Sequence, residues 1–137
     1  TAALAFHAFG WKGDVLERAS ELSEIGAGIQ VSPNGMKVFR ALGIEDRVSR
    51  QAFQPEALEM RFGKSGNRIF QIPAREVIIV WGVDPYLHLH RADLVAALAE
   101  LLHQRQPNAV HLGAECEGYK NTDLGVGVTL KSGETIE

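Results

Sequence analysis

Two charged side chains at the end of an expected strand are the first candidates for chemistry. Glu17 and Arg18 follow the short run that starts at Asp14. A carboxylate at the carboxyl end of the second strand of a dinucleotide-binding unit can accept hydrogen bonds from a ribose diol. The glycine-rich phosphate turn of such a unit lies roughly 20 residues before the acidic residue, which here falls before Thr1. Taken alone, Glu17 is more simply interpreted as a solvated charge at a strand end.

A second candidate is the run of residues 26–30, GAGIQ, in which two glycines flank Ala27. Glycine lets a backbone approach another group closely, because no Cβ stands in the way. Gln30 can donate and accept hydrogen bonds, but an amide is no general base near neutral pH. A role for Gln30 would therefore be orientation of a ligand, and an ordinary polar loop residue is an equally good interpretation.

The histidines, the cysteine and two aromatic residues indicate no further chemistry. His88 and His90 alternate along one strand face, a spacing that metal sites use, but no third ligand at a suitable spacing accompanies them. A half-exposed strand face is the favoured interpretation. Cys116 is the single cysteine, so no internal disulfide forms; it fits a reducing compartment and is expected to be a small buried hydrophobic side chain. Trp81 and Tyr86 are expected to pack rather than to react.

The elements that must position these residues follow from periodicity and turn signals. Ser32 and Pro33 are typical of a helix start, with the serine hydroxyl as the capping acceptor, and Gly10 and Gly43 are typical of helix ends. Residues 58–62 and 68–72 are expected to form two antiparallel strands joined by GKSGN. The other elements expected are helices over residues 1–10, 33–42 and 92–104, and strands over 14–16, 86–90, 110–112, 126–130 and 135–137.

Composition and charge exclude several classes of protein. The chain has 137 residues, of which 45% are hydrophobic and 23% charged, as in an ordinary folded domain. The net charge is -3 and neither sign collects in a run, so nucleic acid and an anionic membrane surface are not expected partners. The longest apolar stretch, residues 77–83, is far shorter than the roughly 20 residues that a bilayer requires.

Three segments read together resemble a known family. The segments are TAALAFHAFG with VLERA, GAGIQVSPNGMKVFRALGI, and YLHLHRADLVAALAELL. In order and spacing they are similar to the FAD-dependent aromatic hydroxylases, flavoprotein monooxygenases that act on salicylate, hydroxybenzoates and hydroxynicotinate. The resemblance covers the whole chain. It implies an α/β fold, specifically an incomplete Rossmann-like FAD-binding fold with inserted antiparallel β-strands. Residues 1–54 and 86–137 would belong to the FAD-binding part, and residues 55–85 to the substrate-side β region.

The resemblance also implies a role for individual residues. Arg91, in the HRADL run, would reach the ribityl-pyrophosphate region, where a guanidinium can engage phosphate through two donors. Gln30 would point toward the substrate pocket. The remaining assignments are Glu17 on the adenosine ribose, Arg18 on the adenine side, Gly26, Ala27, Gly28 and Ile29 beside the flavin ring, and the backbone at Cys116 near the adenine.

The activity implied is hydroxylation of a small aromatic acid by NAD(P)H and O2 on bound FAD, in a cytoplasmic protein that could be a homo-oligomer. No nucleophile or general base can be named. Two alternatives remain open: another FAD oxidoreductase of the same fold, such as an oxidase, epoxidase or halogenase, and a non-catalytic truncated module. The family's glycine fingerprint, Asp-Gly motif and Gly-Asp motif have no counterpart in the sequence. The chain is therefore expected to be an interior piece of a longer protein and to bind FAD weakly by itself.

Overall fold

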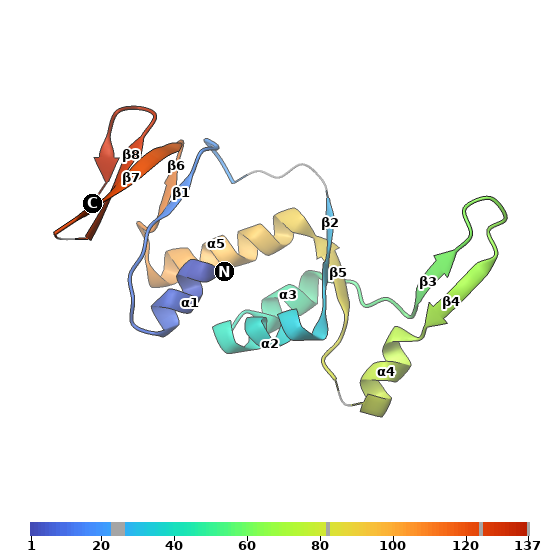
Figure 1. The fold of residues 1–137 in the computed structure, drawn as a ribbon. Coiled ribbons are helices and arrows are strands. Elements are labelled where there is room, and N and C mark those ends of the chain that lie inside the picture. Colours follow the sequence, from blue (N-terminus) through green and yellow to red (C-terminus); the bar gives the residue numbers. More distant parts are fainter. Residues whose placement is uncertain (23–26, 82, 124, 137) are drawn as a thin grey trace. The chain divides into compact units, whose positions relative to one another are not determined.

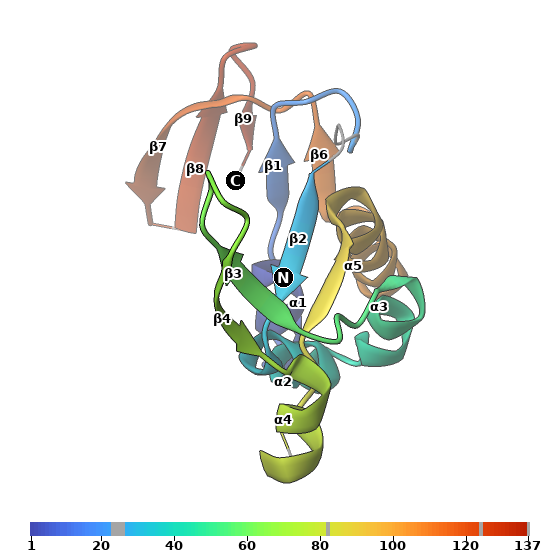
Figure 2. The same ribbon diagram turned by 90° about the vertical axis from the view of Figure 1, so that its right-hand side faces the viewer.

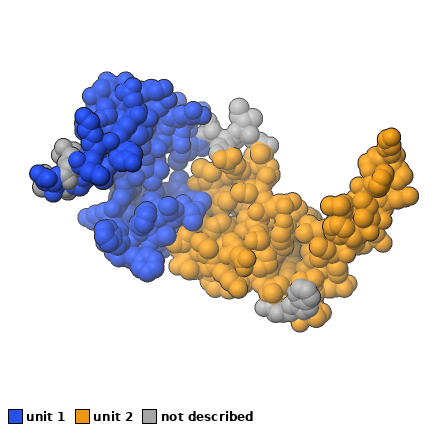
Figure 3. All heavy atoms as spheres, viewed as in Figure 1, with its two compact units in different colours: residues 1–23, 98–137 blue, residues 24–97 orange. Residues whose placement is uncertain are grey.

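The computed structural model describes residues 1–22, 27–81, 83–123 and 125–136 (Figure 1). Two compact units divide the chain, residues 1–23 with 98–137 and residues 24–97 (Figure 3). Each unit is a mixture of helices and strands. In chain order the elements are α1 (Ala2–Ala8), β1 (Val15–Glu17), β2 (Gly28–Val31), α2 (Pro33–Leu42), α3 (Glu45–Gln51), β3 (Leu58–Arg61), β4 (Arg68–Ile72), α4 (Ala74–Trp81), β5 (Leu87–His90), α5 (Arg91–Arg105), β6 (Val110–Leu112), β7 (Cys116–Thr122), β8 (Gly125–Leu130) and β9 (Thr135–Ile136).

In the first unit, β1 and β6 run parallel, and they lie side by side in Figure 2. Their register places Glu17 opposite Leu112, so the carboxyl ends of both strands meet at one edge. Beyond the strands, the Ala114 N–H donates to the carbonyl of Glu17 over 2.8 Å. This bond ties the backbone of Glu17 to the chain that leaves β6 and holds the strand tip in place.

The rest of this unit contains α1 and an antiparallel sheet. Helix α1 ends before Gly10, whose φ of 81° is the left-handed geometry expected of a helix end there. The sheet has the order β7-β8-β9, so the predicted hairpin at the end of the chain is confirmed. Strand β7 was not predicted, because its sequence CEGYKNT has no regular alternation of apolar residues.

In the second unit, β2 and β5 form an antiparallel ribbon with two chemically different faces. Val31, Leu87 and Leu89 point inward and are 5%, 4% and 6% exposed. Gln30 and His88, which are direct register partners, lie on the opposite face. Helices α2 and α3 contact the ribbon and supply the rest of its core, formed by Met36, Phe39, Leu42, Ile44 and Val48.

Glycine has a structural role at two positions, one within α2 and one directly after it. A Cβ on Gly35 would lie 2.9 Å from Cγ1 of Val31, so glycine allows the helix to approach β2 closely. Gly43 follows the helix with φ 77°, as predicted for its C-terminal end. At the other end, Pro33 is the first helical residue as expected, but the predicted cap is wrong. Ser32 makes no side-chain capping hydrogen bond.

The predicted pair of antiparallel strands is confirmed as the hairpin β3–β4. Leu58 and Met60 face Ile72 and Phe70 across the hairpin, and they share one apolar side.

Two helices were not predicted. The segment of α3, EDRVSRQ, has a single buried apolar residue, Val48, and so shows no helical period. Helix α4 contains most of the continuous apolar run of residues 77–83, which likewise shows no helical period. Among the described residues, no helix is long and apolar enough to cross a membrane.

Candidate functional site

The carboxylate of Glu17 is oriented by the backbone two residues further along the chain. One carboxylate oxygen, Oε1, accepts a hydrogen bond of 2.9 Å from the Ala19 N–H. Glu17 is half-buried at the carboxyl end of β1. Among the described residues no donor contacts its second oxygen, Oε2. The side chain therefore presents one free acceptor at the edge where the carboxyl ends of two parallel strands meet, the position at which α/β proteins bind ligands.

Arg18 and Cys116 lie in the same unit. Arg18 is exposed directly after the strand. The expectation that Cys116 is buried is wrong, because the side chain is exposed at the start of β7 and its Sγ donates to the carbonyl of Gly118 over 3.7 Å. A local sequence pattern could not show this, since burial there depends on how β7 packs.

The second unit brings together the GAGIQ run and the start of α5. Because β2 and β5 are paired, Gly28 lies opposite His90, and the Arg91 N–H donates to the carbonyl of Ala27 over 3.0 Å. A Cβ added at Gly28 would meet no atom within 4 Å, so its exposed backbone is open on that side. Ile29 is half-buried, and Gly26 lies outside the described residues. The structure therefore brings the start of α5 next to the GAGIQ run through the backbone of Ala27 and Arg91.

Gln30 has a partner that sequence reasoning did not assign to it. The Tyr86 hydroxyl donates to Oε1 of Gln30 over 2.7 Å, although the residues are 56 positions apart. The ring of Tyr86 also meets His88 edge to face, with 5.6 Å between centroids. Tyr86 was expected only to pack. The alternation of Tyr86 and His88 along one strand face was the available signal, but its pairing with Gln30 needs the register of β2 against β5.

Ion pairs fix the segment that leads into β5. Arg40, near the end of α2, pairs with Glu45 of α3 over 2.7 Å and also with Asp84. The hydrogen bonds of Glu45 and Asp84 raise the pKa of the Arg40 guanidinium above its already high value, so it stays charged. Asp84 precedes Tyr86 by two residues, and this cluster therefore ties Tyr86 to the helical layer.

The two histidines of β5 differ in exposure. His88 is half-buried and His90 exposed, as expected for a half-exposed strand face. Within the described part of the chain, no group of three or more histidine, cysteine or acidic side chains could hold a metal ion. Nε2 of His88 is buried, with no hydrogen-bond partner among the described residues.

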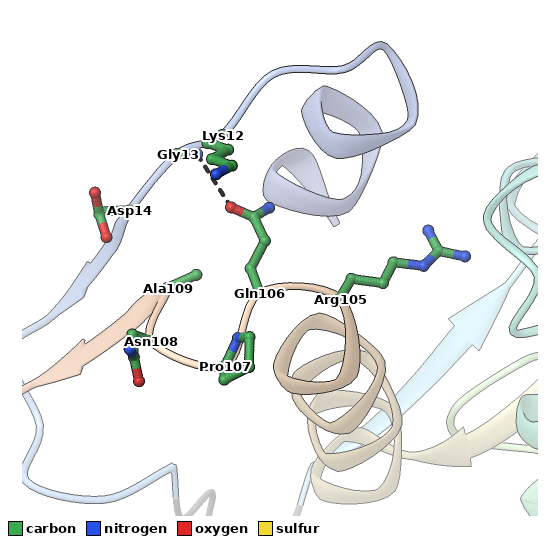
Figure 4. A pocket seen from close by; sticks show the side chains of 8 residues that line it. All are labelled: Lys12, Gly13, Asp14, Arg105, Gln106, Pro107, Asn108 and Ala109. Carbon is green, nitrogen blue, oxygen red and sulfur yellow. Dashed lines mark hydrogen bonds between the residues drawn. The ribbon is translucent and has the colours of Figure 1, made fainter.

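One hollow does not coincide with the predicted site. It has a volume of about 370 Å³ and lies where the chain enters β1 and β6, at the opposite strand ends from Glu17. Figure 4 shows Gln106 reaching toward Gly13, whose N–H donates to it over 3.4 Å, while Arg105 points away. The other residues that line it are Lys12, Asp14, Pro107, Asn108 and Ala109.

Another hollow belongs to the second unit and is bordered by Tyr86. Its volume is about 100 Å³, and its lining is almost wholly apolar. Asp84 also borders it, and the apolar residues are Pro33, Leu58, Ile72, Ala74, Val77, Ile78 and Val83. This apolar hollow offers a surface for a ring, and Tyr86, which borders it, is also the residue whose hydroxyl bonds Gln30.

Comparison with solved structures indicates the class of protein to which the fold is similar. No family model matches the chain. Among solved structures, the tetrameric form of 2-methyl-3-hydroxypyridine-5-carboxylic acid oxygenase matches 99% of this chain and 33% of its own, with a TM-score of 0.81 and 25% identity. HpxO of Klebsiella pneumoniae, solved with FAD, matches 98% of this chain and 33% of its own, with a TM-score of 0.78 and 27% identity. The fold is thus that of a segment of the FAD-dependent oxygenases.

Curated relatives narrow this class. The chain is 33% identical to 3-hydroxybenzoate 6-hydroxylase 1 of Aquipseudomonas alcaligenes over 99% of this chain and 34% of the relative. It is 38% identical to 6-hydroxynicotinate 3-monooxygenase of Pseudomonas fluorescens over 68% of this chain and 24% of the relative. The chain is homologous to a segment of FAD-dependent aromatic hydroxylases, and it spans about a quarter to a third of the length of these relatives.

Proposed function

We propose that the chain is the cofactor-holding part, with one edge of the substrate site, of an FAD-dependent monooxygenase that hydroxylates a small aromatic acid using NAD(P)H and O2. Two of its relatives are named for action on 3-hydroxybenzoate and on 6-hydroxynicotinate. The match to the first of them covers 99% of this chain. The single observation that carries the proposal is the half-buried carboxylate of Glu17 at the carboxyl end of a parallel strand pair.

The residues present fit FAD on two observations. Oε2 of Glu17 is available to accept hydrogen bonds from a ribose hydroxyl, since only Oε1 is used by the Ala19 N–H. The backbone of Gly28 is exposed, with nothing within 4 Å of the position of a Cβ, so a flat ring can approach it. The parallel pair β1–β6 would then be part of a Rossmann-like sheet, and residues 55–85 part of the substrate-side region.

Each residue has a defined task in this proposal. Glu17 binds the ribose, and Arg18 lies against the adenine side. Arg91 neutralises phosphate charge at the start of α5. The remaining tasks are the flavin-side backbone of Gly26, Ala27, Gly28 and Ile29, the adenine-side backbone of Cys116, and orientation of substrate by Gln30.

FAD, when bound and reduced by NAD(P)H, supplies the oxygen activation that no side chain can provide. The chain's own part is to bind, orient and exclude water. The hollow beside Tyr86 suits the apolar face of an aromatic ring, because its lining exposes almost no polar surface. None of the described side chains is assigned as a nucleophile or general base, so the proposal requires no covalent step on the protein.

The test is substrate-stimulated NAD(P)H oxidation by the full-length polypeptide that carries this sequence. We expect purified protein to contain FAD, and 3-hydroxybenzoate or 6-hydroxynicotinate to accelerate NAD(P)H oxidation with formation of a hydroxylated product. Oxidation of NAD(P)H that none of a panel of aromatic acids accelerates would favour another FAD oxidoreductase. Purified protein without flavin that also fails to bind added FAD would refute the proposal.

A further inference from the structure

The hydrogen bond between Tyr86 and Gln30 restricts what the amide can offer to a ligand. A glutamine amide carries one acceptor oxygen and two N–H donors. The Tyr86 hydroxyl donates to the oxygen over 2.7 Å. Gln30 is exposed, and this is the one hydrogen bond of its side chain among the described residues. The amide nitrogen, with both of its donors, is therefore the part that remains available at the surface.

Tyr86 is itself held from several sides. Its ring meets His88 edge to face, and His88 is fixed by two backbone hydrogen bonds with Phe53, of 2.6 and 2.7 Å. Asp84, two residues earlier, pairs with Arg40, and the Asp84 side chain is only 13% exposed. These contacts hold the Tyr86 ring and the adjoining chain, and the hydroxyl that donates to Oε1 favours the orientation in which the amide oxygen of Gln30 faces Tyr86.

We infer that Tyr86 is a positioning residue that holds Gln30 with its amide nitrogen outward, so that this face of the β2–β5 ribbon binds an oxygen acceptor of a ligand. Two ligands of the proposed function carry such an acceptor: the carboxylate of an aromatic acid and a carbonyl of the flavin ring. The inference rests on the proposed function for its ligands, but its geometry stands on the protein alone. A ligand that offers only donors at this point would not be bound.

The first test concerns the geometry and needs no cofactor. In the full-length apoprotein, Tyr86→Phe should shift the side-chain amide signals of Gln30 in a ¹H–¹⁵N spectrum, because the hydroxyl donor is lost. Tyr119→Phe is the matched control, since Tyr119 is the only other tyrosine and is 73% exposed on β7. Unchanged Gln30 signals in Tyr86→Phe, with the fold intact, would overturn the inference.

The second test asks whether Tyr86 acts through Gln30. With 3-hydroxybenzoate as probe, Tyr86→Phe should raise KM, or the Kd of FAD, about 3- to 10-fold, the range of one lost neutral hydrogen bond. A rise in KM alone assigns the acceptor to the substrate, and a rise in the Kd of FAD assigns it to the flavin. In a Gln30→Ala background the same tyrosine substitution should have no further effect. An equal effect in both backgrounds would show a merely structural role and overturn the inference.

A third variant separates donor from acceptor. Gln30→Glu keeps an oxygen that can accept from Tyr86 but removes both N–H donors. We expect binding of the probe to weaken at least as much as in Gln30→Ala. Retained affinity in Gln30→Glu would show that the donors are not used. Absence of flavin from the unsubstituted full-length protein would instead refute the proposed function, while the spectroscopic result would still stand.

Discussion

The role of the Glu17 carboxylate, whose Oε1 accepts a hydrogen bond from the Ala19 N–H, can be tested by substitution. In Glu17→Gln the amide oxygen can still accept from the Ala19 N–H, so the local turn is kept while the charge is lost. We expect the Kd of FAD in the full-length protein to rise about 10- to 100-fold, because hydrogen bonds to charged groups contribute roughly 1.5 to 3 kcal/mol. Flavin fluorescence quenching measures this change. Glu117→Gln, at an exposed position of β7, is the control and should bind as the unsubstituted protein does.

The single thiol gives a second test at the residue scale. Cys116 is exposed, contrary to the sequence expectation. In the 137-residue chain we expect a disulfide reagent such as 5,5′-dithiobis-(2-nitrobenzoate) to modify one thiol without denaturant, and to modify none in the Cys116→Ser variant. If the native protein reacts only after unfolding, the exposed position of Cys116 at the start of β7 is wrong.

Helix α2 depends on the glycine at its end. Gly43 has φ 77°, and the N–H of the next residue, Ile44, donates to the carbonyl of Phe39 over 2.9 Å, which closes the last turn. A Cβ in this conformation costs about 1 to 2 kcal/mol. We therefore expect Gly43→Ala to lower the free energy of unfolding by about 1 kcal/mol in urea denaturation. Gly13→Ala is the control, since Gly13 has no positive φ and space for a Cβ. Equal stability of the two variants would contradict the assignment of this cap.

The hairpin β3–β4 should respond to pH through Glu59. Hydrogen bonds from Arg61 and Arg68 lower the pKa of Glu59 below the ordinary carboxyl value. A carboxyl group whose pKa is lower in the folded state stabilises that state above its ordinary pKa. This stabilisation is lost as the pH falls through the lowered value. We expect hydrogen exchange of the hairpin amides to be faster at pH 3 than the intrinsic pH dependence explains, and Glu59→Gln to remove that difference. A pH response that persists unchanged in Glu59→Gln would assign it to another group.

At the scale of the whole molecule, residues 1–137 expose large apolar side chains. Phe9 is 83% exposed and Ile79 is 82% exposed. Such surfaces promote association when nothing covers them. We expect the isolated 137-residue chain to self-associate with rising concentration in sedimentation velocity, and to show no submicromolar binding of FAD by fluorescence quenching. Tight FAD binding by a monomer would show that these residues suffice as a cofactor domain.

The two candidate regions differ in how far local sequence could define them. Glu17 was identified because a strand and its end can be recognised from adjacent residues, and Arg91 through the resemblance of the HRADL run to the FAD-dependent aromatic hydroxylases. The roles of both in FAD binding stay predictions. Tyr86 was missed as a partner of Gln30 because their contact joins residues 56 positions apart. Contacts of that separation depend on strand register, which no local pattern states.

The sequence by itself determined the helices and strands whose signals are local, including the ends at Gly10 and Gly43 and the hairpin around GKSGN. These follow from backbone preferences and side-chain periodicity over a few residues. Only the tertiary structure decided that Tyr86 bonds Gln30, that Arg40 ties Asp84 to α2, and that Cys116 is exposed. Pairing and burial depend on groups far apart in the chain, whose proximity arises only when apolar faces such as those of β2 and β5 are buried together.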